Sequence, residues 1–178
     1  MNRVRVIIFA GSPADKAHFE TIQKALEVFG IPCLARIASA HKTPKRLLDM
    51  IKSYDSEGIP TVYITVAGRS NALSGLVDAA TQYPVLACPS PSEQWSAYDI
   101  WSSLRMPSGI ASALILDPVN AALCAAKLLA LKDEALRENI RRFQQQQIDR
   151  LIEALDAGGE FVDLEFQRWK AAKEAGQR

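Results

Sequence analysis

The feature of this sequence that most constrains its fold is a regular alternation of short apolar runs and amphipathic stretches. The first run, VRVIIFA at residues 4–10, is typical of a strand covered on both faces. The stretch from Asp15 to Phe29 then repeats apolar residues at helical spacing, and Gly30 supplies a stop. Four more pairs follow, which predict strands at 33–37, 61–67, 84–88 and 113–116 and helices at 44–54, 71–81, 98–104 and 119–131.

Strands that alternate strictly with helices favour a parallel sheet. We therefore predict an α/β fold of three layers, a flavodoxin-like parallel five-stranded sheet with helices on both faces. Ligands in such sheets bind beyond the carboxyl ends of the strands, so we expect a site in the loops that follow them. The side chains predicted to face the core are Phe19, Ile22, Leu26 and Phe29 in the first helix and Leu47, Leu48 and Ile51 in the second.

The last quarter of the chain has a different pattern. Between Lys132 and Gly158 there is neither glycine nor proline, and the apolar residues keep a helical spacing, which predicts a long helix. A short final helix is expected around Phe161, Leu164 and Trp169. We assign residues 1–131 to one α/β domain and 132–178 to a C-terminal helical extension that packs on neighbouring subunits.

Composition excludes several classes of partner. The chain has 21 Lys and Arg against 20 Asp and Glu, so its net charge of +1 does not indicate nucleic-acid binding. None of its apolar runs is as long as a membrane span, and the first residues lack the hydrophobic core of a signal peptide. We therefore expect a cytoplasmic protein without membrane partners.

The three cysteines Cys33, Cys88 and Cys124 are odd in number, widely spaced and free of a CxxC pattern. This arrangement favours reduced, buried thiols over disulfides or a zinc site, and we predict neither a metal nor a cofactor.

The loops after the first two predicted strands carry polar groups suited to an anionic substrate. GSPAD, residues 11–15, offers backbone N–H groups and a hydroxyl to a phosphate, although Asp15 could simply cap the next helix. SAHKTP, residues 39–44, combines a hydroxyl, an imidazole and an ammonium group. Because histidine titrates near pH ~6.5, His41 is a candidate proton carrier, although a loop histidine is often structural. We expect His18, in the first helix, to be a surface or packing residue.

The next two loops add further candidates. In AGRSNALSG, residues 67–75, Gly68 permits a close turn, and Arg69 can bind a carboxylate or phosphate. Ser70 and Asn71 can donate hydrogen bonds, but either could instead cap the following helix. The fourth loop is long, rich in proline and serine, and carries two tryptophans, so we expect a lid or a subunit contact there.

Five segments, GSPAD, SAHKTP, AGRSNALSG, CPSPSEQW and WSSLRMPSG, occur in this order. Together they closely resemble phosphoribosylaminoimidazole (AIR) carboxylase, the PurE family of purine biosynthesis, over residues 4–131. The third segment resembles the class II branch. Class I mutases carry a Gly-Gly-Ala-Ala-His-Leu-Pro type segment at this place, and they usually have arginine where this chain has Lys42.

The resemblance implies roles for the loop residues. The first loop would hold the ribose phosphate end of AIR, with Asp15 at the ribose hydroxyls. The histidine of the second loop would work beside the imidazole ring, and the third loop would shape the carbon dioxide pocket. The implied site residues are Gly11, Ser12 and Asp15 in the first loop, Ser39, His41 and Lys42 in the second, and Gly68, Arg69, Ser70 and Asn71 in the third.

The implied reaction is carboxylation of AIR at C4 by free CO2 to give 4-carboxy-5-aminoimidazole ribonucleotide (CAIR), catalysed by a homo-octamer. Two alternatives remain. A class I mutase would take its carboxyl group from N5-carboxyaminoimidazole ribonucleotide. A noncatalytic flavodoxin-like module would only bind a phosphorylated ligand at the same loops.

Overall fold

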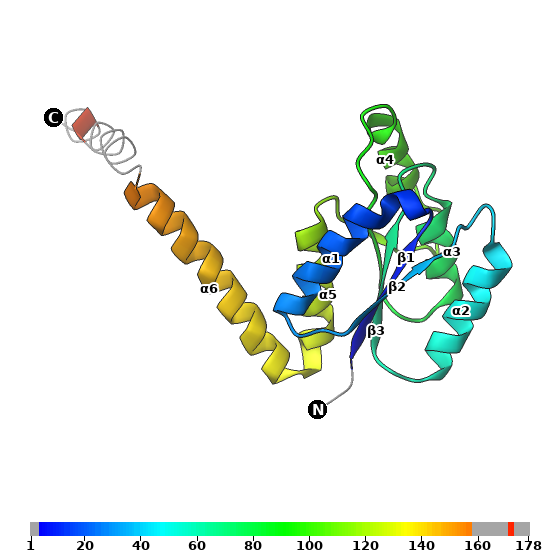
Figure 1. Ribbon diagram of the computed structural model, residues 1–178, viewed down its shortest axis with the longest axis horizontal. Coiled ribbons are helices and arrows are strands. Elements are labelled where there is room, and N and C mark those ends of the chain that lie inside the picture. Colours follow the sequence, from blue (N-terminus) through cyan, green and yellow to red (C-terminus); the bar gives the residue numbers. More distant parts are fainter. Residues whose placement is uncertain (1–3, 158–170, 173–178) are drawn as a thin grey trace. The chain divides into compact units, whose positions relative to one another are not determined.

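The computed structural model describes residues 4–157 and 171–172 and has a five-stranded parallel sheet at its centre (Figure 1). The strand order is β2-β1-β3-β4-β5, which is the flavodoxin-like order, so the predicted sheet is confirmed. The strands are β1 (Arg5–Ala10), β2 (Cys33–Ile37), β3 (Thr61–Val66), β4 (Val85–Ala87) and β5 (Ala113–Leu114).

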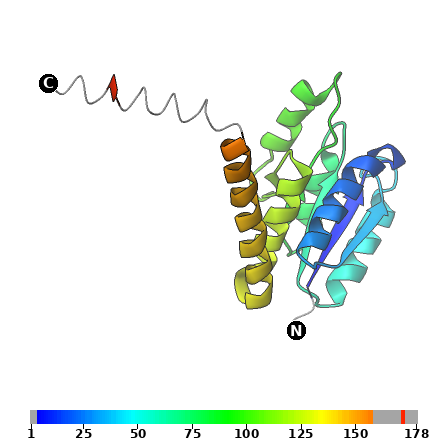
Figure 2. The ribbon, with the colours of Figure 1, turned by 60° about the vertical axis from the view of Figure 1, so that its left-hand side comes forward.

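Helices cover both faces of this sheet. Figure 1 shows α1 and α5 on one side and α2 and α3 on the other, which gives the three predicted layers. In Figure 2, α4 and the first turn of α1 lie at the end of the sheet opposite the start of β1. The helices are α1 (Lys16–Val28), α2 (Pro44–Ser56), α3 (Ala72–Ala80), α4 (Ser96–Leu104), α5 (Pro118–Leu129) and α6 (Glu134–Ala157), with 3₁₀ turns at η1 (Pro13–Asp15) and η2 (Ala130–Lys132).

The sequence of the central strands follows from their position. Every residue of β1 and β3 is buried, and the two strands pair in parallel with Val6 beside Val62 and Ile8 beside Ile64. A strand covered on both faces has no solvent side, which is why the first apolar run does not alternate with polar residues. Gly30 ends the first helical segment as predicted, with φ +71° and an N–H that donates to the Glu27 carbonyl at 3.0 Å.

One core prediction is wrong. Leu47 and Ile51 of α2 are buried, but Leu48 is 40% exposed. Adjacent helix residues point about 100° apart, whereas residues four apart share a face. Leu48 therefore lies beside the buried stripe and not in it.

The predicted long helix near the C-terminus is confirmed as α6, and its early residues Leu136 and Ile140 are buried. The chain divides after Ile140 into two compact units. The expected break at Gly158 and the final helix around Phe161, Leu164 and Trp169 lie outside the described residues. Within the described part, no helix is both long and apolar enough to span a membrane.

The sheet order also fixes where a ligand can enter. The chain leaves β1 for β2 on one side and continues from β3 to β4 on the other, so the loops after β1 and β3 separate at this point. Such a switch in strand order is where open α/β sheets bind ligands. It places residues 11–15 opposite residues 67–71.

Candidate active site

The loops after β1, β3 and β4 meet around the carboxylate of Asp15. This side chain is 7% exposed, and the Ser90 hydroxyl donates to its Oδ1 at 2.6 Å. Gly68 lies against the pair, since a Cβ at this position would be in ordinary contact with both, 3.8 Å from Asp15 Oδ1 and 3.7 Å from Ser90 Cβ. Asp15 is the N-cap residue of α1, but its carboxylate accepts from Ser90 and makes no hydrogen bond to the helix backbone. The side-chain cap considered from sequence is therefore not formed, and the carboxylate instead joins the first loop to the loop after β4.

The first loop is held by short local bonds. The Gly11 N–H donates to the Val66 carbonyl at 2.8 Å and extends the pairing of β1 with β3. The Ser12 hydroxyl oxygen accepts from the Ala14 N–H at 3.2 Å. Since a hydroxyl oxygen can accept and donate at once, the Ser12 proton is left to donate to a ligand oxygen.

The second loop is a turn closed by local hydrogen bonds, and the side chains of His41 and Lys42 are exposed on it. The Thr43 N–H donates to the Ser39 carbonyl at 2.9 Å, and the Ser39 N–H donates to Thr43 Oγ1 at 3.0 Å. Ser39 Oγ accepts from the Lys42 N–H at 3.2 Å. His41 and Lys42 are exposed between these bonds, so the turn presents an imidazole and an ammonium group outward.

The third loop is anchored by the segment that follows β4. The Arg69 guanidinium lies over the Trp95 ring, 5.8 Å from its centroid. Ser70 has φ +43°, in the left-handed region, and is exposed like Arg69. The Asn71 side chain is buried, with Oδ1 accepting from the Ser74 N–H at 3.2 Å and Nδ2 donating to Ser103 Oγ at 2.7 Å.

The alternative considered for Asn71 therefore holds, because its side chain caps α3. Both ends of this amide are used in bonds within the protein. Its assignment as a substrate-binding side chain stays a prediction that the described contacts do not favour.

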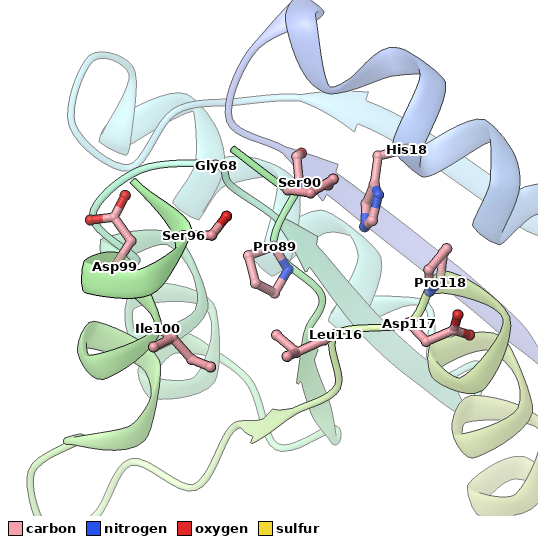
Figure 3. A pocket seen from close by; sticks show the side chains of 11 residues that line it. His18, Gly68, Pro89, Ser90, Ser96, Asp99, Ile100, Leu116, Asp117 and Pro118 are labelled. Carbon is pink, nitrogen blue, oxygen red and sulfur yellow. The ribbon is translucent and has the colours of Figure 1, made fainter. Parts of the chain in front are cut away.

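A cavity of about 570 Å³ opens at the carboxyl ends of the strands, next to Gly68 and Ser90 (Figure 3). Its volume lies in the range of small-molecule sites. In Figure 3, Ile100 of α4 and Leu116 point toward each other across the space, and the His18 ring reaches in from α1. The lining is formed by His18, Gly68, Pro89, Ser90, Pro91, Ser96, Asp99, Ile100, Leu116, Asp117 and Pro118.

His18 lies in the wall of this cavity, a place that the sequence interpretation as a surface or packing residue did not predict. Its Nε2 lies 3.4 Å from Cys88 Sγ, and burial lowers the pKa of its imidazole although Asp15 and Asp117 act in the opposite direction. A neutral imidazole therefore lines the cavity at physiological pH. His18 precedes Ile22 by one helical turn, so it borders the buried stripe of α1, and this spacing is the signal that could have revealed it.

The three cysteines are free thiols, but the prediction that they are buried holds fully only for Cys88, since Cys33 and Cys124 are partly exposed. Burial raises the pKa of both Cys33 and Cys88 to about 12, and it also raises the pKa of Cys124. These groups are thiols at neutral pH, so none is an activated nucleophile. Within the described residues, no group of three or more His, Cys, Asp or Glu side chains is placed to hold a metal ion.

The single chain thus brings together some predicted site residues and separates others. Asp15 and Gly68 meet at Ser90, a residue that the sequence analysis did not select. His41 and Lys42 lie outside the cavity lining described above.

Comparison with known proteins accounts for this set of loops. Residues 5–150 match the family model described as AIR carboxylase. The chain belongs to the AIR carboxylase family. It is 46% identical over 151 residues to the phosphoribosylaminoimidazole carboxylase of Treponema denticola, covering 85% of this chain and 95% of the relative. It is 50% identical over 142 residues to the phosphoribosylaminoimidazole carboxylase of Archaeoglobus fulgidus, covering 80% and 78%.

The structural comparison agrees. The crystal structure of Treponema denticola PurE superimposes with a TM-score of 0.85 at 44% identity and covers 89% of this chain and 99% of that one. A bifunctional phosphoribosylaminoimidazole carboxylase/succinocarboxamide synthetase of Mus musculus is 44% identical over 140 residues, which are 79% of this chain and 33% of the relative. The predicted family is confirmed, and the findings support an AIR carboxylase of purine biosynthesis. The relatives' names do not separate class I from class II.

Proposed function

We propose that this AIR carboxylase adds free CO2 to C4 of AIR and forms CAIR. C4 of the aminoimidazole is an enamine-like carbon that can attack CO2 directly. The new C4–carboxylate bond leaves a tetrahedral carbon that still bears its proton. Transfer of this proton to a base returns the bonding electrons to the ring and restores aromaticity. His41 is the proposed base, since a positioned imidazole suits proton transfer near neutral pH.

The other loops have supporting roles in this proposal. Gly11, Ser12 and Asp15 bind the ribose phosphate, and Lys42 and Ser39 flank the base. CO2 is small and apolar and offers little binding energy, so the site must stabilise the carboxylate that develops from it. Arg69 and the Ser70 hydroxyl are suited to this task, because charge-assisted and preorganised donors stabilise an oxyanion strongly.

The observation that carries the class II proposal is the composition of the third loop. Between Gly68 and Asn71 it supplies one guanidinium and small polar groups, and the Asn71 amide is already bonded within the protein. This set suits capture of CO2 better than it suits a second proton relay.

One observation favours the class I alternative. His18 places a neutral imidazole in the cavity wall that Gly68 also lines. A mutase must accept N5-carboxyaminoimidazole ribonucleotide and move its carboxyl group to C4, and a second histidine could assist proton transfer there. The two candidates differ in the carboxyl donor and can be separated by changing it.

The donor experiment has a clear expected result. With AIR as substrate, the initial rate of CAIR formation should rise with dissolved CO2 and need no ATP, biotin or added metal. N5-carboxyaminoimidazole ribonucleotide should react no faster than its spontaneous breakdown supplies AIR. Efficient conversion of that nucleotide in CO2-depleted buffer, without use of AIR, would instead establish a class I mutase. Binding of AIR without turnover of either substrate would indicate the noncatalytic module.

We also propose a symmetric homo-octamer that acts in the cytoplasm and has sites at subunit junctions. Support comes from the exposed position of His41 and from the apolar surface of α4, where Tyr98 is 75%, Trp101 60% and Leu104 55% exposed. Apolar side chains gathered on one helix are typical of a contact surface.

Light scattering of the full chain should therefore report an assembly of eight copies. Substituting Trp101 with Glu places a charge on this surface and should shift the scattering mass toward smaller species while the circular dichroism spectrum is kept. The matched control is Lys52→Glu, a charge change on the exposed side of α2. A full-length chain that is monomeric and fully active would contradict the proposal.

A further inference from the structure

Ser70 has an unusual backbone conformation for a residue with a side chain. Among the described residues it is the one non-glycine residue with positive φ, at +43°. The left-handed region is disfavoured for L-residues because Cβ approaches the following carbonyl oxygen. Such conformations persist where the surrounding structure forces them, often at functional sites. The contacts that hold Ser70 are therefore informative.

Asn71, the residue after Ser70, is held by three hydrogen bonds. The Asn71 N–H donates to Ser102 Oγ at 3.0 Å, and its Nδ2 donates to Ser103 Oγ at 2.7 Å. Asn71 Oδ1 accepts from the Ser74 N–H, which ties the same side chain to the start of α3. Asn71 and Ser103 are 8% and 6% exposed, so water competes little for this bond.

Both serine partners belong to α4, some thirty residues along the chain. The Ser102 hydroxyl donates its proton to the Asp99 carbonyl at 2.6 Å, which orients its oxygen to accept from Asn71. Trp95, just before α4, covers the Arg69 guanidinium. Residues on both sides of Ser70 are therefore held by one segment, Trp95–Ser103.

We propose that Ser103, together with Ser102, is a positioning residue for the third loop. It holds Asn71 so that Ser70 keeps its left-handed backbone and remains beside Arg69 in the arrangement that receives the carboxyl group. Ser103 does not touch the substrate in this account; it acts through Asn71. The inference rests on the proposed function for the role of Ser70 and Arg69.

The test is a double-mutant cycle between Ser103→Ala and Ser70→Gly. Glycine adopts positive φ about as readily as negative φ, so a loop with Gly at 70 depends less on being held. In the Ser70 background, Ser103→Ala should lower kcat/KM about 10-fold, because the unheld loop relaxes to negative φ. In the Ser70→Gly background, the same substitution should lower kcat/KM by less than about 3-fold relative to Ser70→Gly alone, a coupling of the size seen between interacting residues.

The outcome that overturns the inference is an equal fold-loss in both backgrounds, or no loss in the Ser70 background. Either result would make Ser103 a merely structural residue. Ser103→Thr keeps the hydroxyl and should restore most of the activity. The matched control is Thr81→Val at the far end of α3, which removes a 2.7 Å bond to Asp55 and should lower Tm without changing kcat/KM.

Two further arms keep the test decisive. If Ser103→Ala does not fold, Ser102→Ala is carried through the same two backgrounds. Ser102 is exposed, and its substitution removes the hydrogen bond that the Asn71 N–H donates to Ser102 Oγ. The cycle is measured with whichever carboxyl donor the unsubstituted protein uses. A failure of direct carboxylation therefore appears in the unsubstituted protein, whereas a failure of this inference appears only as missing coupling.

Discussion

The His41→Asn variant is expected to lose at least ~10²-fold in kcat while its Tm and its affinity for AIR stay close to those of the unsubstituted protein. Asparagine keeps much of the size and hydrogen bonding of the imidazole but cannot accept a proton near neutral pH. His41 is exposed on a turn that is closed by bonds between Ser39 and Thr43, so the substitution should leave the fold intact. Steady-state kinetics with saturating AIR and CO2 measure the effect.

The control substitution for this experiment must lie outside the proposed site. His18 is not a neutral comparison, because it lines the cavity beside Gly68. Lys45→Gln is a better control, since Lys45 is exposed in the first turn of α2 and pairs with Asp49 at the surface. Lys45→Gln should keep full turnover. Near-native kcat in His41→Asn would remove this histidine from the mechanism and make His18 the next candidate base.

Replacing Asp15 with alanine is expected to raise KM for AIR by about 10- to 100-fold with a smaller change in kcat. A hydrogen bond to a charged group contributes about 1.5–3 kcal/mol, and one factor of ten corresponds to about 1.4 kcal/mol. The proposed partner of the carboxylate is a ribose hydroxyl, which is bound alike in substrate and transition state. A contact of this kind changes KM more than kcat.

A substrate variant sharpens the Asp15 experiment. A deoxyribose analogue of AIR should bind the unsubstituted protein more weakly and should lose little more in the Asp15→Ala variant, because the same contact is missing in both. Ser90→Ala should raise KM less than Asp15→Ala does, since it removes one partner of the carboxylate and keeps the charge. Asp49→Ala, at an exposed position of α2, is the matched control. An unchanged KM in Asp15→Ala would refute its assigned role.

Much of the fold was predictable because a parallel sheet leaves a strong local signal. Buried strands such as β1 and β3 must be apolar along their whole length, and each is followed by an amphipathic helix, so order and type of the elements can be derived from the sequence. The error at Leu48 shows the limit of this signal. Apolar residues on neighbouring helix positions cannot both be central to one face, and only packing decides which one is buried.

The candidate site was predictable to the extent that its residues follow strands directly. Gly11, His41 and Gly68 all come just after a strand, and the parallel sheet places such loops at one edge. Contacts between distant segments were not predictable. The Ser90 hydroxyl reaches Asp15 across 75 residues, and α4 reaches Asn71 across about thirty, without any repeating pattern that links them.

The burial of the cysteines has a practical consequence for spectroscopic work on this enzyme. At pH 8, a thiol with pKa of about 12 is ionised in roughly one molecule in 10⁴, whereas an exposed thiol with pKa about 8.5 is ionised in roughly one in four. A cysteine introduced at Lys45 should therefore react with maleimide dyes about 10³-fold faster than Cys33 or Cys88. Fluorophores could then be attached beside the His41 loop without first removing these two native cysteines.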